Sequence, residues 1–173
     1  LKKVFEVYQY FNYNRKNFSV LGTEIEREDI VSYGDERFNI NAKSDLIVTD
    51  KSQILIIDFK TSSTSYYSLP KFKALETEDF KSVGSLQLPF YILTFKNLFN
   101  DYKDFNASIM LLGSSTVQED MLYDEKHEFD DHQKLFEELI KKEIYDIINS
   151  ESFNPTDDSS KCLRCEFKTI CYV

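Results

Sequence analysis

The chain has 173 residues, of which 42% are hydrophobic, 15% aromatic and 29% charged, which suits one folded domain with a substantial core. This composition excludes an intrinsically disordered or a fibrous chain. No hydrophobic run approaches the roughly 18 to 20 residues that cross a bilayer, and no signal-peptide pattern opens the chain. We therefore expect a cytoplasmic domain that has no membrane partner.

The formal net charge of −9 is concentrated in one part of the chain. Residues 104–158 carry fifteen acids and four bases, whereas residues 59–103 carry six bases and four acids. Acidic runs of this kind most often form the solvated face of a helix and its flanking loops. Because overall charge does not decide what a local groove binds, the value of −9 does not exclude an anionic polymer as a partner.

Hydrophobic periodicity predicts the element order α-β-β-β-α-β-α, a mixed α/β architecture. The run Ile54-Leu55-Ile56-Ile57 is the strongest signal, since a short continuous aliphatic segment indicates a strand buried on both faces. No internal repeat or long linker divides the chain, so residues 1–173 are expected to form a single domain with a cysteine-rich tail over 153–173. The expected elements are a helix over 4–16, strands over 20–31, 38–48 and 54–57, a helix over 83–99, a strand over 107–112 and a helix over 131–149.

The candidate chemistry begins at the polar end of this buried strand. Period-two alternation places Asp58 and Lys60 on one side of the strand, and counting back across the preceding hairpin places Asp45 close to Asp58. Two carboxylates there would bind a hard cation such as Mg²⁺ or Mn²⁺. Lys60 would neutralise charge developing on a phosphate or hold the attacking water. On its own, however, an Asp-x-Lys pair is more often a structural ion pair.

Two further patterns lie downstream. Gln87 and Tyr91 stand at i and i+4 on one helix face, a spacing that equally suits the polar rim of a half-buried helix. Cys162, Cys165 and Cys171 form a C-x2-C-x5-C pattern within ten residues, which favours a metal site over disulfides. Thiolates at this spacing suit zinc or an iron–sulfur cluster, either of which takes four ligands.

The order and spacing of these features resemble the RecB-like nucleases of the PD-(D/E)XK superfamily. Within them the chain is most similar to the iron–sulfur branch, which includes AddB-type helicase–nuclease domains and CRISPR-associated exonucleases. The resemblance covers roughly residues 20–173. It implies an α/β restriction-endonuclease-like core, α-β-β-β-α-β, with a mixed central sheet flanked by helices. It also implies a Mg²⁺-dependent deoxyribonuclease, expected to be an exonuclease, that acts in DNA repair or recombination.

The resemblance also implies roles for individual residues. Asp45 and Asp58 are similar to the metal-binding acids, and the Phe59 carbonyl would be a further ligand. Lys60 resembles the catalytic lysine. Gln87 and Tyr91 resemble the motif that supports the site and contacts DNA. The last three ligands of a [4Fe–4S] cluster would be Cys162, Cys165 and Cys171.

The chain departs from the family in lacking two upstream groups. The family's first cysteine and a metal-binding His of its first helix have no counterpart, and both would lie before Leu1. This fits an N-terminally truncated fragment of a longer protein, in which the cluster is absent or replaced by zinc. Glu24 and Glu26 would either supply a further acid or form a solvated strand face. The two histidines, His127 and His132, are expected to be exposed.

Three functional hypotheses follow. The first is a metal-dependent DNA nuclease, attached to a helicase domain or to a helicase subunit of the same repair machine. The second is a catalytically silent nuclease fold that serves as a DNA-binding or scaffolding module. The third is a zinc-stabilised interaction domain. Intact Asp58 and Lys60 favour the first, because a retired site has no physical reason to keep two charges at a buried strand edge.

Overall fold

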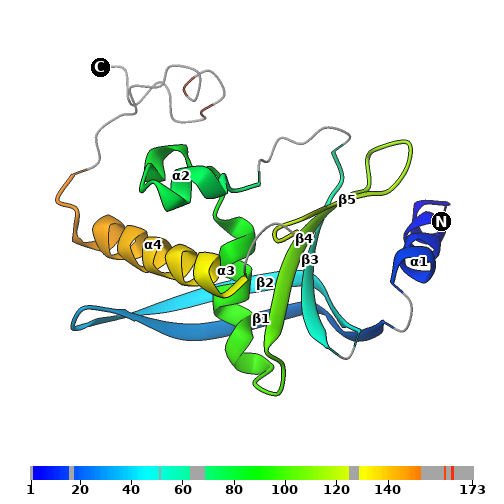
Figure 1. Ribbon diagram of the computed structural model, residues 1–173, viewed down its shortest axis with the longest axis horizontal. Coiled ribbons are helices and arrows are strands. Elements are labelled where there is room, and N and C mark those ends of the chain that lie inside the picture. The colour runs from blue at the N-terminus through cyan, green and yellow to red at the C-terminus, as the bar shows by residue number, and fades with distance from the viewer. Residues whose placement is uncertain are drawn as a thin grey trace.

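The chain folds around a mixed five-stranded sheet with the strand order β1-β2-β3-β4-β5, and helices lie on both of its faces (Figure 1). A computed structural model describes residues 2–15, 18–50, 52–62, 69–124, 129–152, 162 and 165. The strands are β1 (Ser19–Tyr33), β2 (Glu36–Thr49), β3 (Gln53–Lys60), β4 (Asp104–Leu111) and β5 (Gln118–Met121). The helices are α1 (Lys2–Asn14), α2 (Phe72–Glu76), α3 (Gln87–Phe95) and α4 (Phe129–Asn149), with 3-10 turns η1 (Phe80–Ser82) and η2 (Lys96–Leu98).

Strand β3 lies at the centre of the sheet. It pairs with β2 in antiparallel and with β4 in parallel fashion, while β1 and β5 pair antiparallel at the two edges. The parallel pairing of β3 and β4 requires a crossover connection, and the segment that carries α2 and α3 supplies it. The end of β3 therefore leads directly into the connection that contains α3.

The aliphatic run of β3 is buried on both faces of the sheet, as the sequence predicts. Ile54 and Ile56 pack with α3 residues such as Ile92 in one core cluster. Leu55 and Ile57 pack on the opposite face with Phe11 of α1. Helices α3 and α4 thus cover one face and α1 covers the other (Figure 1).

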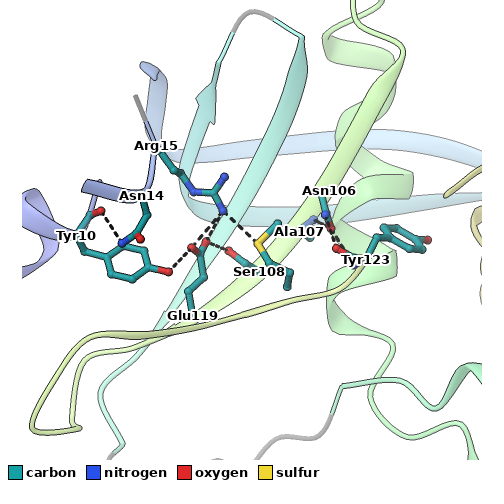
Figure 2. A network of polar contacts seen from close by, with 9 residues as sticks. Tyr10, Asn14, Arg15, Asn106, Ala107, Ser108, Glu119 and Tyr123 are labelled. Carbon is teal, nitrogen blue, oxygen red and sulfur yellow. Dashed lines mark hydrogen bonds and ion pairs between the residues drawn. The ribbon is translucent and has the colours of Figure 1, made fainter. Parts of the chain in front are cut away.

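Helix α1 is attached to the sheet by a buried carboxylate on β5 (Figure 2). Glu119 accepts hydrogen bonds from Ser108 Oγ at 2.7 Å and from Tyr10 OH at 3.0 Å. Arg15 Nη2 lies 3.1 Å from Glu119 Oε2 as an ion pair. Burial raises the pKa of Tyr10 to about 12, and the nearby Glu119 carboxylate adds to that shift. The sequence places Glu119 in the acidic stretch that we expected to be solvated, so for this residue the expectation is wrong.

The α/β fold class is confirmed, with differences in detail. The helix expected over 83–99 begins only at Gln87, and Pro89 lies in its first turn, where proline is tolerated. The short elements α2 and β5 were not predicted. His132 is mostly buried, unlike the exposed residue expected, because it packs edge-on against Phe72 and its Nε2 lies 2.8 Å from Glu76. His127 lies outside the described residues.

No helix in the ranges given above combines the length and apolar character that a membrane span requires.

Candidate active site

The two predicted acids, Asp45 and Asp58, lie at the point where the pairing of β2 with β3 ends. The antiparallel ladder ends at the pair Leu46 and Ile57, so Asp45 and Asp58 are the next residues on their strands and lie across from each other. The Phe59 N–H donates a hydrogen bond to Asp45 Oδ2 at 2.7 Å. One oxygen of Asp45 therefore takes the place of the next backbone acceptor at the end of the ladder. The sequence analysis did not predict this hydrogen bond, although the strand register that places Asp45 opposite Asp58 could have indicated it.

Asp58 is buried, with 5% of its surface exposed, and α3 supplies two donors to one of its oxygens. Oδ1 accepts from Tyr91 OH at 2.9 Å and from Gln87 Nε2 at 3.0 Å. Gln87 Nε2 also lies within hydrogen-bonding distance, 3.0 Å, of the Tyr91 hydroxyl. The i, i+4 spacing predicted from the sequence thus brings both side chains to the same carboxylate oxygen.

The second oxygen of Asp58 faces Lys60. Lys60 Nζ lies 2.7 Å from Asp58 Oδ2 as an ion pair, and the lysine side chain is partly exposed to solvent. Oδ2 itself is fully buried and accepts no hydrogen bond of good geometry. The carboxylate therefore has one oxygen held by neutral donors and one that faces the Lys60 ammonium.

Tyr91 keeps its proton at neutral pH. Burial raises the pKa of this phenol to about 12; the hydrogen bond from Gln87 opposes the rise, and the adjacent Asp58 carboxylate adds to it. A protonated hydroxyl is the form that can donate to Asp58. Tyr91 is consequently a hydrogen-bond donor here, and it is not in a state to act as a base.

The Phe59 carbonyl faces the same space as the two acids. Along a strand, the N–H and C=O of one residue point to one side and alternate from residue to residue. The Lys60 carbonyl accepts from Leu112 of the β4 side at 2.8 Å, whereas the Phe59 N–H donates to Asp45 of β2. The Phe59 carbonyl is therefore directed toward the β2 side, beyond the last ladder pair.

This donor set fits a small hard cation. Two carboxylates and a backbone carbonyl are oxygen ligands, and Mg²⁺ typically takes only one or two carboxylates, completing its shell with water and substrate phosphate. The buried Asp58 Oδ2, which lacks a hydrogen bond, is the oxygen that such an ion would satisfy. Within the ranges that the structure describes, no group of three or more His, Cys, Asp or Glu side chains could hold a metal.

The other candidate ligands lie elsewhere. Glu24 forms an ion pair with Lys43, and Glu26 accepts from Asn41 Nδ2 at 3.2 Å, both on the exposed surface of the hairpin. These contacts favour the solvated strand face over a third acid of the site.

The cysteine pattern is only partly described. Cys162 and Cys165 are free thiols of intermediate exposure, and the Cys165 N–H donates to the Cys162 carbonyl at 3.2 Å. Cys171 lies outside the described residues. The predicted cluster of three cysteines therefore stays a prediction.

A family model described as the PD-(D/E)XK nuclease superfamily matches residues 1–172. The solved structure titled "Crystal structure of SSO0001" is 17% identical over 99% of this chain and 68% of that chain, with a TM-score of 0.46. A likeness of that degree is too distant to bear on function. Among curated proteins, none matches the chain significantly.

Proposed function

The chain belongs to the PD-(D/E)XK nuclease superfamily, and from that premise we propose that it is a metal-dependent deoxyribonuclease that hydrolyses phosphodiester bonds. The observation that carries this proposal is the carboxylate of Asp58, which is buried beside Asp45 and Lys60 at the end of β3. A buried charge costs several kcal/mol unless it is paired or bound to a metal. Such a group at a strand end is a candidate functional residue.

The residues divide the chemistry among them. Asp45, Asp58 and the Phe59 carbonyl would hold Mg²⁺ or Mn²⁺, which when bound supplies Lewis-acid activation of water and phosphate. The donors Gln87 and Tyr91 orient Asp58 through Oδ1, so that Oδ2 is left for the metal.

Lys60 contributes the positive charge of the site. Its partly exposed ammonium would leave Asp58 Oδ2 and place its charge on a phosphate oxygen, or hold the attacking water in line. A preorganised cation that faces charge developing in the transition state is worth far more in a water-poor site than in bulk solvent. Lys60 is thus the residue assigned to transition-state stabilisation.

Cleavage of labelled single- and double-stranded DNA in Mg²⁺ or Mn²⁺ tests this proposal. Asp58→Ala and Lys60→Ala are expected to lower the rate by roughly 100-fold or more, because each removes a preorganised charge from the reacting centre. Matched controls are Asp35→Ala in the β1–β2 turn and Lys134→Ala on the exposed face of α4, which should cut like the parent. Equal cutting by Asp58→Ala, or cutting that survives EDTA, would contradict the assignment.

Finer features of the proposal follow the resemblance of the sequence to RecB-like nucleases. They are exonuclease action in DNA repair or recombination, association with a helicase domain or subunit, and a [4Fe–4S] cluster bound in part by Cys162, Cys165 and Cys171. Iron content and visible absorbance of the purified protein test the cluster. Zinc in place of iron, or neither metal, would remove the iron–sulfur assignment and leave the Asp58 site unaffected.

A further inference from the structure

The backbone that leaves the catalytic strand is in unusually close contact with the end of β4. The last ladder bond between the two strands runs from the Leu112 N–H to the Lys60 carbonyl at 2.8 Å. Gly113 follows directly, and its Cα faces the backbone of Thr61 and Ser62. Lys60 and the two residues after it therefore lie against Leu112 and Gly113.

Only glycine fits at position 113 in this arrangement. A Cβ atom built there would lie 2.3 Å from the Thr61 carbonyl oxygen and 2.6 Å from the Ser62 carbonyl oxygen. Cβ atoms in proteins essentially never approach a heavy atom within 3.0 Å, so the two backbones would have to part by at least about 0.7 Å, the difference between 3.0 and 2.3 Å. The atoms in contact belong to backbone, so no flexible side chain can turn aside to make room.

Helix α1 contacts the segment that follows β4. Lys3 Nζ of α1 donates to the Ser114 carbonyl at 2.8 Å, and α1 is itself attached to β5 through Glu119. Moving Gly113 and Ser114 away would therefore strain this contact. A side chain at position 113 would also displace the Thr61–Ser62 segment, which is covalently joined to Lys60.

We propose that Gly113 is a positioning residue for Lys60. The absence of a side chain lets the end of β4 contact the segment that leaves β3, and this contact fixes the lysine backbone so that Nζ reaches Asp58 Oδ2. The inference rests on the proposed function, since it takes its meaning from the catalytic role assigned to Lys60. It adds a residue that is not among Asp45, Asp58, Lys60, Gln87 and Tyr91 and whose nearest neighbours are the Thr61 and Ser62 backbone atoms.

The test compares Gly113→Ala with Gly34→Ala. Gly34 lies in the β1–β2 turn with φ of +58° and open space around its Cα, so alanine there strains the backbone without touching the site. Gly113→Ala is expected to lower kcat by roughly 10- to 100-fold, the scale of effect for a misplacement of about 1 Å, with KM changed by less than about twofold. Gly34→Ala is expected to lower Tm and to keep the parent kcat. Unchanged kcat in Gly113→Ala would overturn the proposal.

A double-mutant cycle separates positioning from general damage. In a Lys60→Ala background, Gly113→Ala should cause no further loss of the residual rate, because the group that it displaces is already gone. The same fold loss in both backgrounds would show that Gly113 acts through something other than Lys60, and the proposal would fall.

Amide hydrogen exchange can be measured on the parent protein. It therefore depends neither on whether a variant folds nor on enzyme activity. If the contact holds the lysine backbone, the Leu112 N–H should exchange as slowly as the Ile109 N–H in the middle of β4. Exchange at the rate of an exposed loop would overturn the inference. Absence of metal-dependent cleavage by the parent would instead overturn the proposed function, so the two failures are distinguishable.

Discussion

Asp58 shows how one buried carboxylate is divided between two tasks. Its Oδ1 receives two neutral donors, Tyr91 and Gln87, and its Oδ2 faces only Lys60. A hydrogen bond to a charged group contributes more than one between neutral groups, so these two donors hold the carboxylate in a fixed orientation. The remaining oxygen is then available to a cation, whether the lysine or a metal.

Replacing Tyr91 by Phe removes one of these donors and also a group that titrates at high pH. We expect Tyr91→Phe to lower the free energy of unfolding at pH 7 by about 1.5 to 3 kcal/mol, the usual contribution of a hydrogen bond to a charged partner. Urea denaturation measures it. Tyr13→Phe, on the 87% exposed Tyr13 of α1, is the control and should change stability by less than about 0.5 kcal/mol.

The same variant has a distinct pH signature. Because burial, above all, raises the pKa of Tyr91 from 10.0 to about 12, the folded state holds this proton more tightly than the unfolded state does. The corresponding stability is complete below pH 10 and is lost as the pH rises from 10 toward 12. The parent should therefore lose stability more steeply than Tyr91→Phe between pH 10 and 11.5. Parallel curves for the two proteins would contradict the shift.

At the scale of elements, the sequence predicts those parts of the fold whose local pattern and tertiary environment agree. The continuous aliphatic run of β3 and the amphipathic repeat of α4 are such cases, and the hairpin register that brings Asp45 to Asp58 follows from counting. Strand β5, with the sequence Gln-Glu-Asp-Met, has no such pattern. It pairs with β4, and its Glu119 is buried against Arg15, a partner 104 residues away in the chain, a contact that no local reading of an acidic stretch could reveal.

Short elements and close backbone contacts escape sequence analysis for a related reason. Helix α2 has five residues, too few for periodicity to register, and packing against α4 stabilises it. Gly113 carries one signal, a glycine directly after a buried strand, but only the structure reveals the Thr61–Ser62 backbone beside it. Features that depend on contacts between distant segments of the chain therefore cannot be predicted from the sequence and are seen only in the structure.

Glu119 is expected to determine whether α1 stays on the sheet. Its side chain is 2% exposed, and Glu119→Ala would leave the partly exposed Arg15 guanidinium without its carboxylate, a loss of about 1.5 to 3 kcal/mol for a hydrogen-bonded charged partner. We expect unfolding at correspondingly lower urea and faster chymotrypsin cleavage at Tyr8 and Tyr13 of α1. Glu138→Ala, on the exposed surface of α4, is the control and should match the parent in both assays.

At the scale of the whole molecule, a net charge of −9 must be reconciled with a polyanionic substrate. Local distribution of charge accounts for it. Most basic side chains with described partners are paired with acids, as Lys96 is with Glu137 and Lys142 with Asp146. Five exposed lysines, in contrast, form no ion pair within the part of the chain that the structure describes. Two of them, Lys2 and Lys103, lie apart, and the other three, Lys71, Lys73 and Lys81, fall within one short stretch of the chain.

The last three lie in the segment of α2 and η1, which directly precedes Gln87 and α3 in the chain. The Lys71 N–H donates to the Val83 carbonyl at 2.8 Å, which holds the start of this segment next to the approach to α3. Ammonium groups without an acidic partner can contact phosphates without first breaking an ion pair. Acidic residues elsewhere on the molecule act mainly through long-range repulsion, which salt screens over about 8 to 10 Å.

DNA binding by a non-cleaving Asp58→Ala protein therefore should depend on salt through these lysines. Each phosphate contact contributes about 0.7 to 0.9 to the slope of log affinity against log salt. We expect the triple change Lys71→Ala, Lys73→Ala and Lys81→Ala to reduce the magnitude of that slope by about 2 to 3. Fluorescence anisotropy over a KCl series measures it.

The control is a second triple variant on α4, which removes the same charge from lysines already paired with acids: Lys134→Ala, Lys141→Ala and Lys142→Ala. An equal loss of slope in both triple variants would mean that net charge, and not the α2–η1 segment, governs binding, whereas a loss confined to the first would place the substrate backbone along that segment.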